Sequence, residues 1–212
     1  MKYEQNEFKV APPDQYWDTI KGNYLPKWKE TKLNLGSGKD YRGGWLNVDV
    51  NKVWNPDLVA DLSHYIHPSL NRDSFEYIVA NDVLEHVRDL GPLMTNLLWL
   101  LKDGGVLEAS VPYDLSYGAW QDPTHVRAFN ERSWLYYTDW FWYVGWREFR
   151  FDLTNLNFLY SEMGLRLLNG GHTQEQVRTT PRMVDQMVVV LTRRQTTDAE
   201  KAEYDQRTRR VA

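Results

Sequence analysis

Glycine and aspartate residues follow three successive apolar segments of this sequence, at positions that suit recognition of a nucleoside. Gly36 and Gly38 come directly after the first segment, where glycine permits a positive φ and a close approach of a ligand to the backbone. Asp49 ends the second segment, where a carboxylate can accept charge-assisted hydrogen bonds from both hydroxyls of a ribose. Asp61 ends the third, within reach of an adenine amine. Each residue alone could be a turn or cap residue, but the ordered set predicts a nucleoside site.

The segment 113–130 carries the residues that could act on a second substrate. His125 is the predicted general base, and Asp122 is its predicted orienting partner. The same segment offers three substrate contacts, of which Arg127 would hold an anionic group: Tyr113, Trp120 and Arg127. The alternative is structural, because Asp122 before Pro123 also suits a turn or helix start in which His125 only packs.

A metal site is the weaker hypothesis for the acidic and imidazole side chains. Oxygen and imidazole ligands could come from Asp82, Glu85, His86, Asp122 and His125. These residues form no compact ligand motif, and the absence of cysteine excludes thiolate ligands, cysteine nucleophiles and disulfides. We therefore predict no metal from the sequence.

Strands alternating with helices must position these residues. Seven segments have the length and composition of strands: 32–35, 45–50, 59–62, 75–80, 106–111, 165–168 and 187–192. Helical spacing of apolar residues is found over 90–101 and 153–163. This alternation predicts an α/β fold with a doubly wound, Rossmann-like and mostly parallel sheet, whose ligands bind at the carboxyl ends of the strands. The connection from Gly38 to Trp45 is too short for a crossover helix and must be a loop.

The chain divides into three predicted parts. Residues 1–30 form a capping helix and connector, residues 31–194 the main domain, and residues 195–212 a charged tail that is a solvated helix or disordered. Within the main domain, residues 31–113 bind the nucleoside and residues 114–194 recognise the substrate. The aromatic segment 134–146 holds four tryptophans, and we expect it to be a local core, an active-site lid or a dimer interface.

Composition limits the classes of protein to consider. The 212 residues are 42% hydrophobic, which is enough for the core of one α/β domain. A formal net charge of -4 gives no broad attraction to nucleic acid. No apolar run is long enough to cross a membrane, and the N-terminus lacks the apolar region of a signal peptide. We predict a cytoplasmic protein with no nucleic-acid or membrane partner, for which a homodimer is one alternative that the sequence leaves open.

Five motifs in order resemble those of class I S-adenosylmethionine-dependent methyltransferases of the type 11 group. They are KLNLGSG, GWLNVDV, DLVADLS, FEYIVANDVLEHV and LLWLLKDGGVLEASVPY, within residues 32–113. The resemblance implies a seven-stranded sheet with an antiparallel last strand, its final pair being 165–168 and 187–192. It also implies a set of cofactor contacts: Asn34, Gly36, Ser37, Gly38, Asp49, Val50, Asp61, Leu62, Asn81, Asp82, Val83 and His86. Two positions depart from the usual motif, with Asn34 in place of an acid and Asp40 in place of a third glycine.

The sequence therefore predicts a methyltransferase that uses S-adenosylmethionine, releases S-adenosylhomocysteine, and methylates an oxygen or nitrogen of a small molecule or glycan. The first alternative is an inactive methyltransferase-like scaffold or interaction protein. An NAD enzyme is disfavoured because Tyr41 stands where its fingerprint requires a third glycine. A nucleotide-sugar enzyme is disfavoured because no DxD pair ends a strand.

Overall fold

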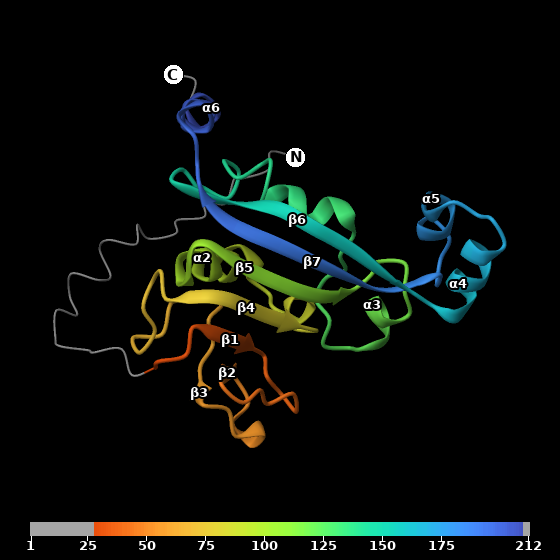
Figure 1. Ribbon diagram of the computed structural model, residues 1–212, viewed down its shortest axis with the longest axis horizontal. Helices are drawn as coiled ribbons and strands as arrows, with labels where there is room; N and C mark the ends of the chain where they lie inside the picture. Colours follow the sequence, from red (N-terminus) through yellow and green to blue (C-terminus); the bar gives the residue numbers. More distant parts are fainter. Residues whose placement is uncertain (1–27, 210–212) are drawn as a thin grey trace, which may run out of the picture.

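A seven-stranded mixed sheet runs through the molecule, shown in Figure 1 as a computed structural model that describes residues 28–209. Its strands are β1 (Lys32–Leu35), β2 (Leu46–Asp49), β3 (Leu58–Val59), β4 (Phe75–Asn81), β5 (Leu101–Pro112), β6 (Phe149–Tyr160) and β7 (Val184–Gln195). Their order is β3-β2-β1-β4-β5-β7-β6. The first five are parallel, and β7 is antiparallel to both of its neighbours. The predicted Rossmann-like sheet is confirmed.

The connection from β1 to β2 is a loop, as its length predicted. The side-chain amides of Asn34 and Asn47, which are both buried, fix the conformation of this loop. The Asn47 side chain accepts hydrogen bonds from Asn34 Nδ2 at 3.1 Å and from the Arg42 backbone N–H at 2.9 Å, and it donates to Asp57 at 2.9 Å. A polar side chain at position 34 is therefore explained by the loop that it supports.

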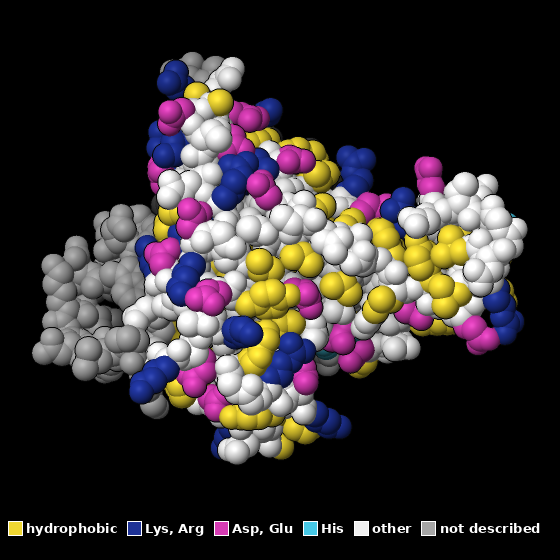
Figure 2. All heavy atoms as spheres, viewed as in Figure 1, with side chains coloured by type: hydrophobic (Ala, Val, Ile, Leu, Met, Phe, Trp, Pro, Cys, Tyr) yellow, Lys and Arg dark blue, Asp and Glu magenta, His cyan; other side chains and the backbone are white. Residues whose placement is uncertain are grey.

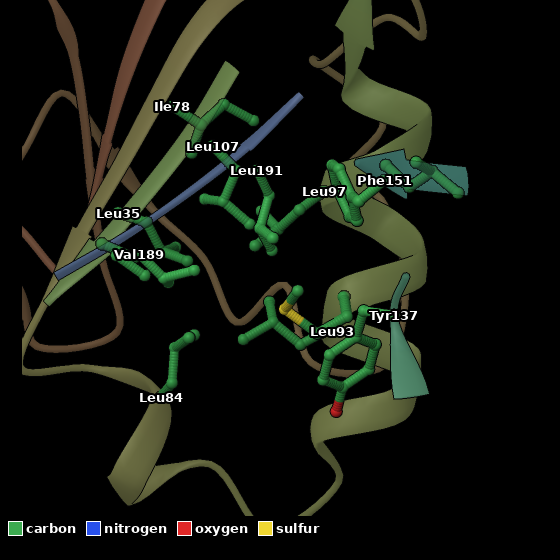
Figure 3. Packing of buried hydrophobic residues seen from close by; sticks show 14 of the residues in the cluster. Leu35, Ile78, Leu84, Leu93, Leu97, Leu107, Tyr137, Phe151, Val189 and Leu191 are labelled. Carbon is green, nitrogen blue, oxygen red and sulfur yellow. The ribbon is translucent and has the colours of Figure 1, made fainter. Parts of the chain in front are cut away.

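The main core lies between one face of the sheet and the helix α2 (Leu90–Leu100). Figure 3 shows Leu93 and Leu97 of α2 pointing toward Ile78, Leu107 and Leu191 of the strands. All five side chains are buried, so α2 fixes the position of the central strands.

The aromatic segment 134–146 completes this core, which is one of its three predicted roles. Trp134, Phe141 and Trp146 are buried, and Trp146 donates a hydrogen bond from Nε1 to Thr95 Oγ1 of α2 at 2.9 Å. The short helix η3 (Glu131–Tyr136) begins the segment. The segment is not wholly buried, since Tyr143 is 65% exposed.

The predicted helix over 153–163 is wrong, because residues 153–160 belong to β6 and only the last two residues of the range are helical. The strand pairs with β7 along its whole length, but its register shifts between Leu153 and Asn155. A bulge adds one residue to a strand and so reverses which side chains face the core. Apolar residues at 149, 151 and 153 therefore continue at 156, 158 and 160. The three-residue step across the bulge resembles helical spacing.

The predicted strand over 165–168 is also wrong, because it lies in the helix α4 (Glu162–Asn169). Ser161 caps this helix by accepting a hydrogen bond from the Gly164 N–H at 3.1 Å. Gly164 comes directly after the predicted helix over 153–163, where a glycine would end it, but it lies in the first turn of α4. A Cβ at Gly164 would lie 2.0 Å from the Met183 carbonyl oxygen, so glycine lets α4 approach the chain before β7. The final antiparallel pair of the sheet is β6 with β7.

The outer elements extend from the two ends of β6 and β7, as Figure 1 shows. At one end lie α4 and α5 (Gln174–Arg178), and at the other lies α6 (Asp198–Thr208). The helix α6 has no buried residue, which matches the solvated-helix alternative for the tail. Most of the predicted segment 1–30 lies outside the described residues.

The sheet face opposite α2 carries half-buried valines, namely Val106, Val188 and Val190. Figure 2 shows hydrophobic side chains at the surface over the sheet. Among the described residues, no helix has the length and apolar character needed to span a membrane.

Candidate functional site

A cavity of about 1050 Å³ opens at the carboxyl ends of the parallel strands β1 to β4. Most of the predicted nucleoside-binding residues line it: Gly36, Asp49, Val50, Asp61, Leu62, Asp82, Val83 and His86. The sheet brings them together because parallel strands end at the same edge. The volume is at the upper end of that of small-molecule sites, so it can hold a nucleoside cofactor and part of a second ligand.

Asp49, at the end of β2, is fixed by two backbone hydrogen bonds. Its Oδ2 accepts from the Gly38 N–H at 2.8 Å, and its Oδ1 accepts from the Asn51 N–H at 2.7 Å. The residue is 8% exposed and lines the cavity. Each carboxylate oxygen keeps a further lone pair, so Asp49 can accept hydrogen bonds from two neighbouring hydroxyls without moving.

Gly36 has two structural requirements for glycine: a positive φ, and space for the side chain of Val83. Its φ is +63°, and a Cβ there would lie 2.3 Å from Val83 Cγ2. Val83 therefore fills the space that the missing side chain leaves, and both residues line the cavity. The glycine sets how far Val83 extends into the wall of the site.

Asp61 lies in the turn after β3, which ends at Val59 and is shorter than predicted. Its Oδ1 accepts a hydrogen bond from the Ser63 N–H at 2.8 Å. Burial would raise the pKa of Asp61, but the hydrogen bonds from Ser63 outweigh it and lower the pKa. Beside it, Leu62 is 2% exposed and gives the cavity an apolar wall.

Four of the predicted cofactor residues stand behind the cavity wall: Asn34, Ser37, Gly38 and Asn81. Asn34 is directed away, because its Nδ2 donates to the Asp40 carbonyl oxygen at 2.6 Å and to Asn47. Gly38 acts through its N–H on Asp49. Asn34, Ser37 and Gly38 belong to β1 and the turn after it, and this turn contacts the end of β2 through backbone N–H groups.

A cluster of one carboxyl and two imidazoles lies beside the cavity. Glu85 and His86 are consecutive in the short helix η2 (Leu84–His86) after β4, and His125 comes from the loop after α3 (Gly118–Gln121). The His86 and His125 rings meet edge to face with centroids 4.6 Å apart. Glu85 is 1% exposed, and neither of its carboxylate oxygens has a hydrogen-bond partner among the described residues. Burial raises the pKa of Glu85 to about 7.

Both imidazoles have a fixed tautomer. His125 Nδ1 lies 3.2 Å from the Ala119 carbonyl oxygen, which can only accept, so Nδ1 carries the proton. Its Nε2 is unprotonated in the neutral ring and lies 4.0 Å from Glu85 Oε1. Thr124 Oγ1 donates to Asp122 at 2.7 Å, so it accepts the hydrogen bond of 2.9 Å from His86 Nδ1. The second nitrogen of each ring therefore offers a lone pair.

Asp122 was predicted to orient His125, and the structure places its carboxylate on Thr124 instead. It accepts from the Thr124 N–H at 2.8 Å and from the Thr124 hydroxyl. These hydrogen bonds lower the pKa of Asp122. Asp122 thus acts on His86 through Thr124, and both Asp122 and Thr124 line the cavity.

Asp82 completes the polar wall next to the imidazoles. It follows β4 with a φ of 52°, and its Oδ1 accepts a hydrogen bond from Gln186 Nε2 of β7 at 3.0 Å. Burial raises the pKa of Asp82 above its usual value. The cavity is acidic overall, since the described residues that line it include five aspartates against one arginine, Arg88.

The three predicted substrate residues lie apart from one another. Tyr113 is buried and donates its hydroxyl hydrogen bond to Glu131 at 3.0 Å. Arg127 donates from Nη2 to the backbone carbonyls of Val87 and Arg88, so it braces the loop after η2. Trp120 is 66% exposed, one residue from the carbonyl that orients His125.

Several wall residues gave no signal in the sequence, because they come from loops or from the one-turn helix η1 (Lys52–Trp54): Asn51, Trp54, His64, Arg88 and Thr124. Glu85 was considered from the sequence only as one of several possible metal ligands, and its burial was not predicted. It is an acid inside the apolar run VLEHV, and a charged residue at such a position is buried or paired.

Comparison with known proteins agrees with the geometry. A family model described as a methyltransferase domain matches residues 11–168. Among solved structures, a SAM-dependent methyltransferase from Archaeoglobus fulgidus is similar with a TM-score of 0.55 and 16% identity, covering 84% of this chain and 90% of its own. One from Mesorhizobium loti has a TM-score of 0.50 and 15% identity, covering 80% of this chain and 94% of its own. No curated protein sequence is significantly similar to the chain. The match confirms the resemblance to class I methyltransferases.

Proposed function

This chain belongs to the methyltransferase domain family, and we propose that it transfers the methyl group of S-adenosylmethionine to an oxygen or nitrogen of a small molecule or glycan. The observation that carries the proposal is Asp49, a carboxylate fixed by two backbone hydrogen bonds at the edge of a 1050 Å³ cavity. The N-terminal half holds the cofactor and the C-terminal half receives the acceptor.

The cavity suits each part of the cofactor. Asp49 accepts from the two ribose hydroxyls, while Asp61 and the apolar side chain of Leu62 hold the adenine. The methionine end extends toward Gly36 and Asp82. The acidic wall favours a ligand with a positive sulfonium charge, which supports this cofactor over a dinucleotide with its two phosphates.

The acceptor enters beside the imidazoles. His86 and Asp82 line the cavity and His125 packs against His86, while the exposed ring of Trp120 would stack on a sugar or another flat group. The same acidic wall disfavours an acceptor rich in phosphate, including nucleic acid.

Bound S-adenosylmethionine supplies an electrophilic methyl group on a sulfonium sulfur. The protein would hold the acceptor atom in line with the S–C bond, so that a lone pair of the acceptor forms the new O–C or N–C bond while the S–C bonding pair stays on sulfur. His125 Nε2 takes the acceptor's proton, and the buried Glu85 carboxylate 4.0 Å away stabilises the imidazolium that forms. The hydrogen bonds from His86 to Thr124 and from Thr124 to Asp122 fix the orientation of the His86 ring.

The test is calorimetric titration of the full chain with S-adenosylmethionine, S-adenosylhomocysteine and NAD. Micromolar binding of both adenosyl ligands and no binding of NAD is the expected result. Asp49→Asn removes one acceptor and should weaken S-adenosylhomocysteine by about 10- to 100-fold, since a hydrogen bond to a charged group contributes about 1.5–3 kcal/mol. Asp103→Asn is the matched control, because Asp103 is exposed in β5 outside the cavity.

Absence of adenosyl binding by the folded wild-type protein would contradict the proposal and favour an inactive scaffold. Equal affinities of the Asp49→Asn and Asp103→Asn variants would contradict the placement of the ribose. Far-UV circular dichroism on each variant separates lost binding from lost folding.

A further inference from the structure

We propose that Glu85, His86 and His125 bind one divalent transition-metal cation at the acceptor end of the cavity. One ligand atom from each of the three residues lies within 4.8 Å of the others. Two imidazoles and one carboxylate are a ligand set that suits zinc, iron, manganese and cobalt ions. This inference rests on the proposed function, because the cation would bind the acceptor of the same reaction.

The first independent observation is the Glu85 carboxyl group. It is 1% exposed, and both of its oxygens are without a hydrogen-bond partner among the described residues. Buried polar groups in native proteins are almost always satisfied, and an ionised carboxylate with no partner is costly. A cation bound by Glu85 would satisfy this group.

The second observation is the state of the two imidazoles. A metal binds histidine through an unprotonated ring nitrogen, and the other nitrogen usually donates to a carbonyl or carboxylate that fixes the ring. His125 donates from Nδ1 to the Ala119 carbonyl, and His86 donates from Nδ1 to Thr124, which is itself held by Asp122. Each ring therefore has its supporting hydrogen bond on one nitrogen and a free lone pair on the other.

The spacing requires only small movements. Ligand atoms of a tetrahedral site with bonds of about 2.1 Å stand about 3.4 Å apart. Glu85 Oε1 and His125 Nε2 are 4.0 Å apart, and the whole set lies within 4.8 Å. Side-chain movements on the order of 1 Å would bring the three ligand atoms to the spacing of a tetrahedral site. The sequence gave no compact motif because η2 and the loop after α3 supply the ligands from positions 39 residues apart in the chain.

Three protein ligands leave coordination positions open, and His86 and Asp82 lie on the cavity wall beside them. An acceptor oxygen bound there would lose its proton more readily, because a cation lowers the pKa of a bound hydroxyl. Because His125 Nε2 binds the cation in this arrangement, it no longer acts as the base and the proton leaves to solvent. A lone pair of the oxygen then forms the new O–C bond as the S–C bonding pair stays on sulfur. The site therefore selects acceptors with a hydroxyl, or a pair of neighbouring hydroxyls, as the methylated group.

The experiment titrates Co²⁺ into untagged, EDTA-treated full-length protein, followed by calorimetry and by the visible absorption of the bound ion. We expect one ion per chain, with binding weakened at least about 100-fold in His125→Ala and in Glu85→Gln. Thr124→Val, which removes the hydroxyl that links His86 to Asp122, should weaken binding about 10- to 100-fold. His172→Ala is the matched control, because His172 also points Nδ1 at a carbonyl, Leu167 O at 3.2 Å, but is exposed outside the cluster.

S-adenosylhomocysteine is titrated into the same samples. Its binding without stoichiometric Co²⁺ binding overturns the metal site and leaves the proposed function with His125 as a simple base. Co²⁺ binding without S-adenosylhomocysteine binding overturns the proposed function and leaves the metal site. Equal Co²⁺ affinities of His125→Ala and His172→Ala also overturn the site, and His86→Ala replaces Glu85→Gln if that variant does not fold.

Discussion

Replacing Gly36 with alanine should destabilise the protein through two separable effects. The residue has a φ of +63°, which costs a residue with a Cβ about 1–2 kcal/mol. The new Cβ would also lie 2.3 Å from Val83 Cγ2, where 3.4–4 Å is an ordinary contact. Such overpacking typically costs about 1–3 kcal/mol. We therefore expect Gly36→Ala to lower the free energy of unfolding by about 2–5 kcal/mol.

Val83→Ala separates the two effects. Alone it should cost about 1 kcal/mol, because Val83 is partly buried. In the double variant the steric overlap disappears and only the backbone strain remains. Its loss of unfolding free energy should therefore be smaller than the sum of the two single-variant losses by about 1–3 kcal/mol. Equilibrium unfolding in urea of the wild type, both single variants and the double variant measures this coupling.

Additive costs, agreeing to within about 0.5 kcal/mol, would refute the contact between Gly36 and Val83 as the reason for the glycine. The same variants test its connection to the site. A displaced Val83 would extend into the cavity that both residues line, so Gly36→Ala should also bind S-adenosylhomocysteine more weakly than the double variant does.

Two further predictions concern stability. The Arg194 guanidinium holds the pKa of Glu200 at about 2, below its usual 4.5, so Glu200 stabilises the fold above pH 4.5 and this contribution is lost as the pH falls toward 2. Thermal melts should accordingly show a lower Tm for Glu200→Gln than for wild type at neutral pH and no difference near pH 2; an equal deficit at both would contradict the ion pair. Trp146→Phe removes the hydrogen bond to Thr95 and should cost about 1–2 kcal/mol in urea unfolding, whereas Tyr143→Phe, at an exposed ring, should cost almost nothing.

The parallel half of the sheet could be predicted because its signals are local. Its first four strands are short and are each ended or followed within two residues by a glycine or an acid, and the parallel arrangement brings these ends to one edge. Asp49, Asp61 and Asp82 were therefore placed at the cavity from the sequence alone.

The antiparallel half was predicted less well because its pattern depends on pairing. The bulge after Leu153 gave β6 the apolar spacing of a helix, and only the ladder with β7 shows that it is a strand. Gly164 looked like a helix terminator, yet its role depends on Met183, which approaches from another part of the chain.

The sequence by itself determined the fold class, the family and the strand ends that form the cavity, since each depends on residues close together in the chain. Tertiary structure decided which partners the polar groups have. Asp122 supports His86 through Thr124, and His125 faces a buried Glu85 whose carboxylate has no hydrogen-bond partner within residues 28–209. These contacts join η2 to a loop almost 40 residues later in the chain. Local patterns of residue types do not predict which residues so far apart in the sequence come into contact.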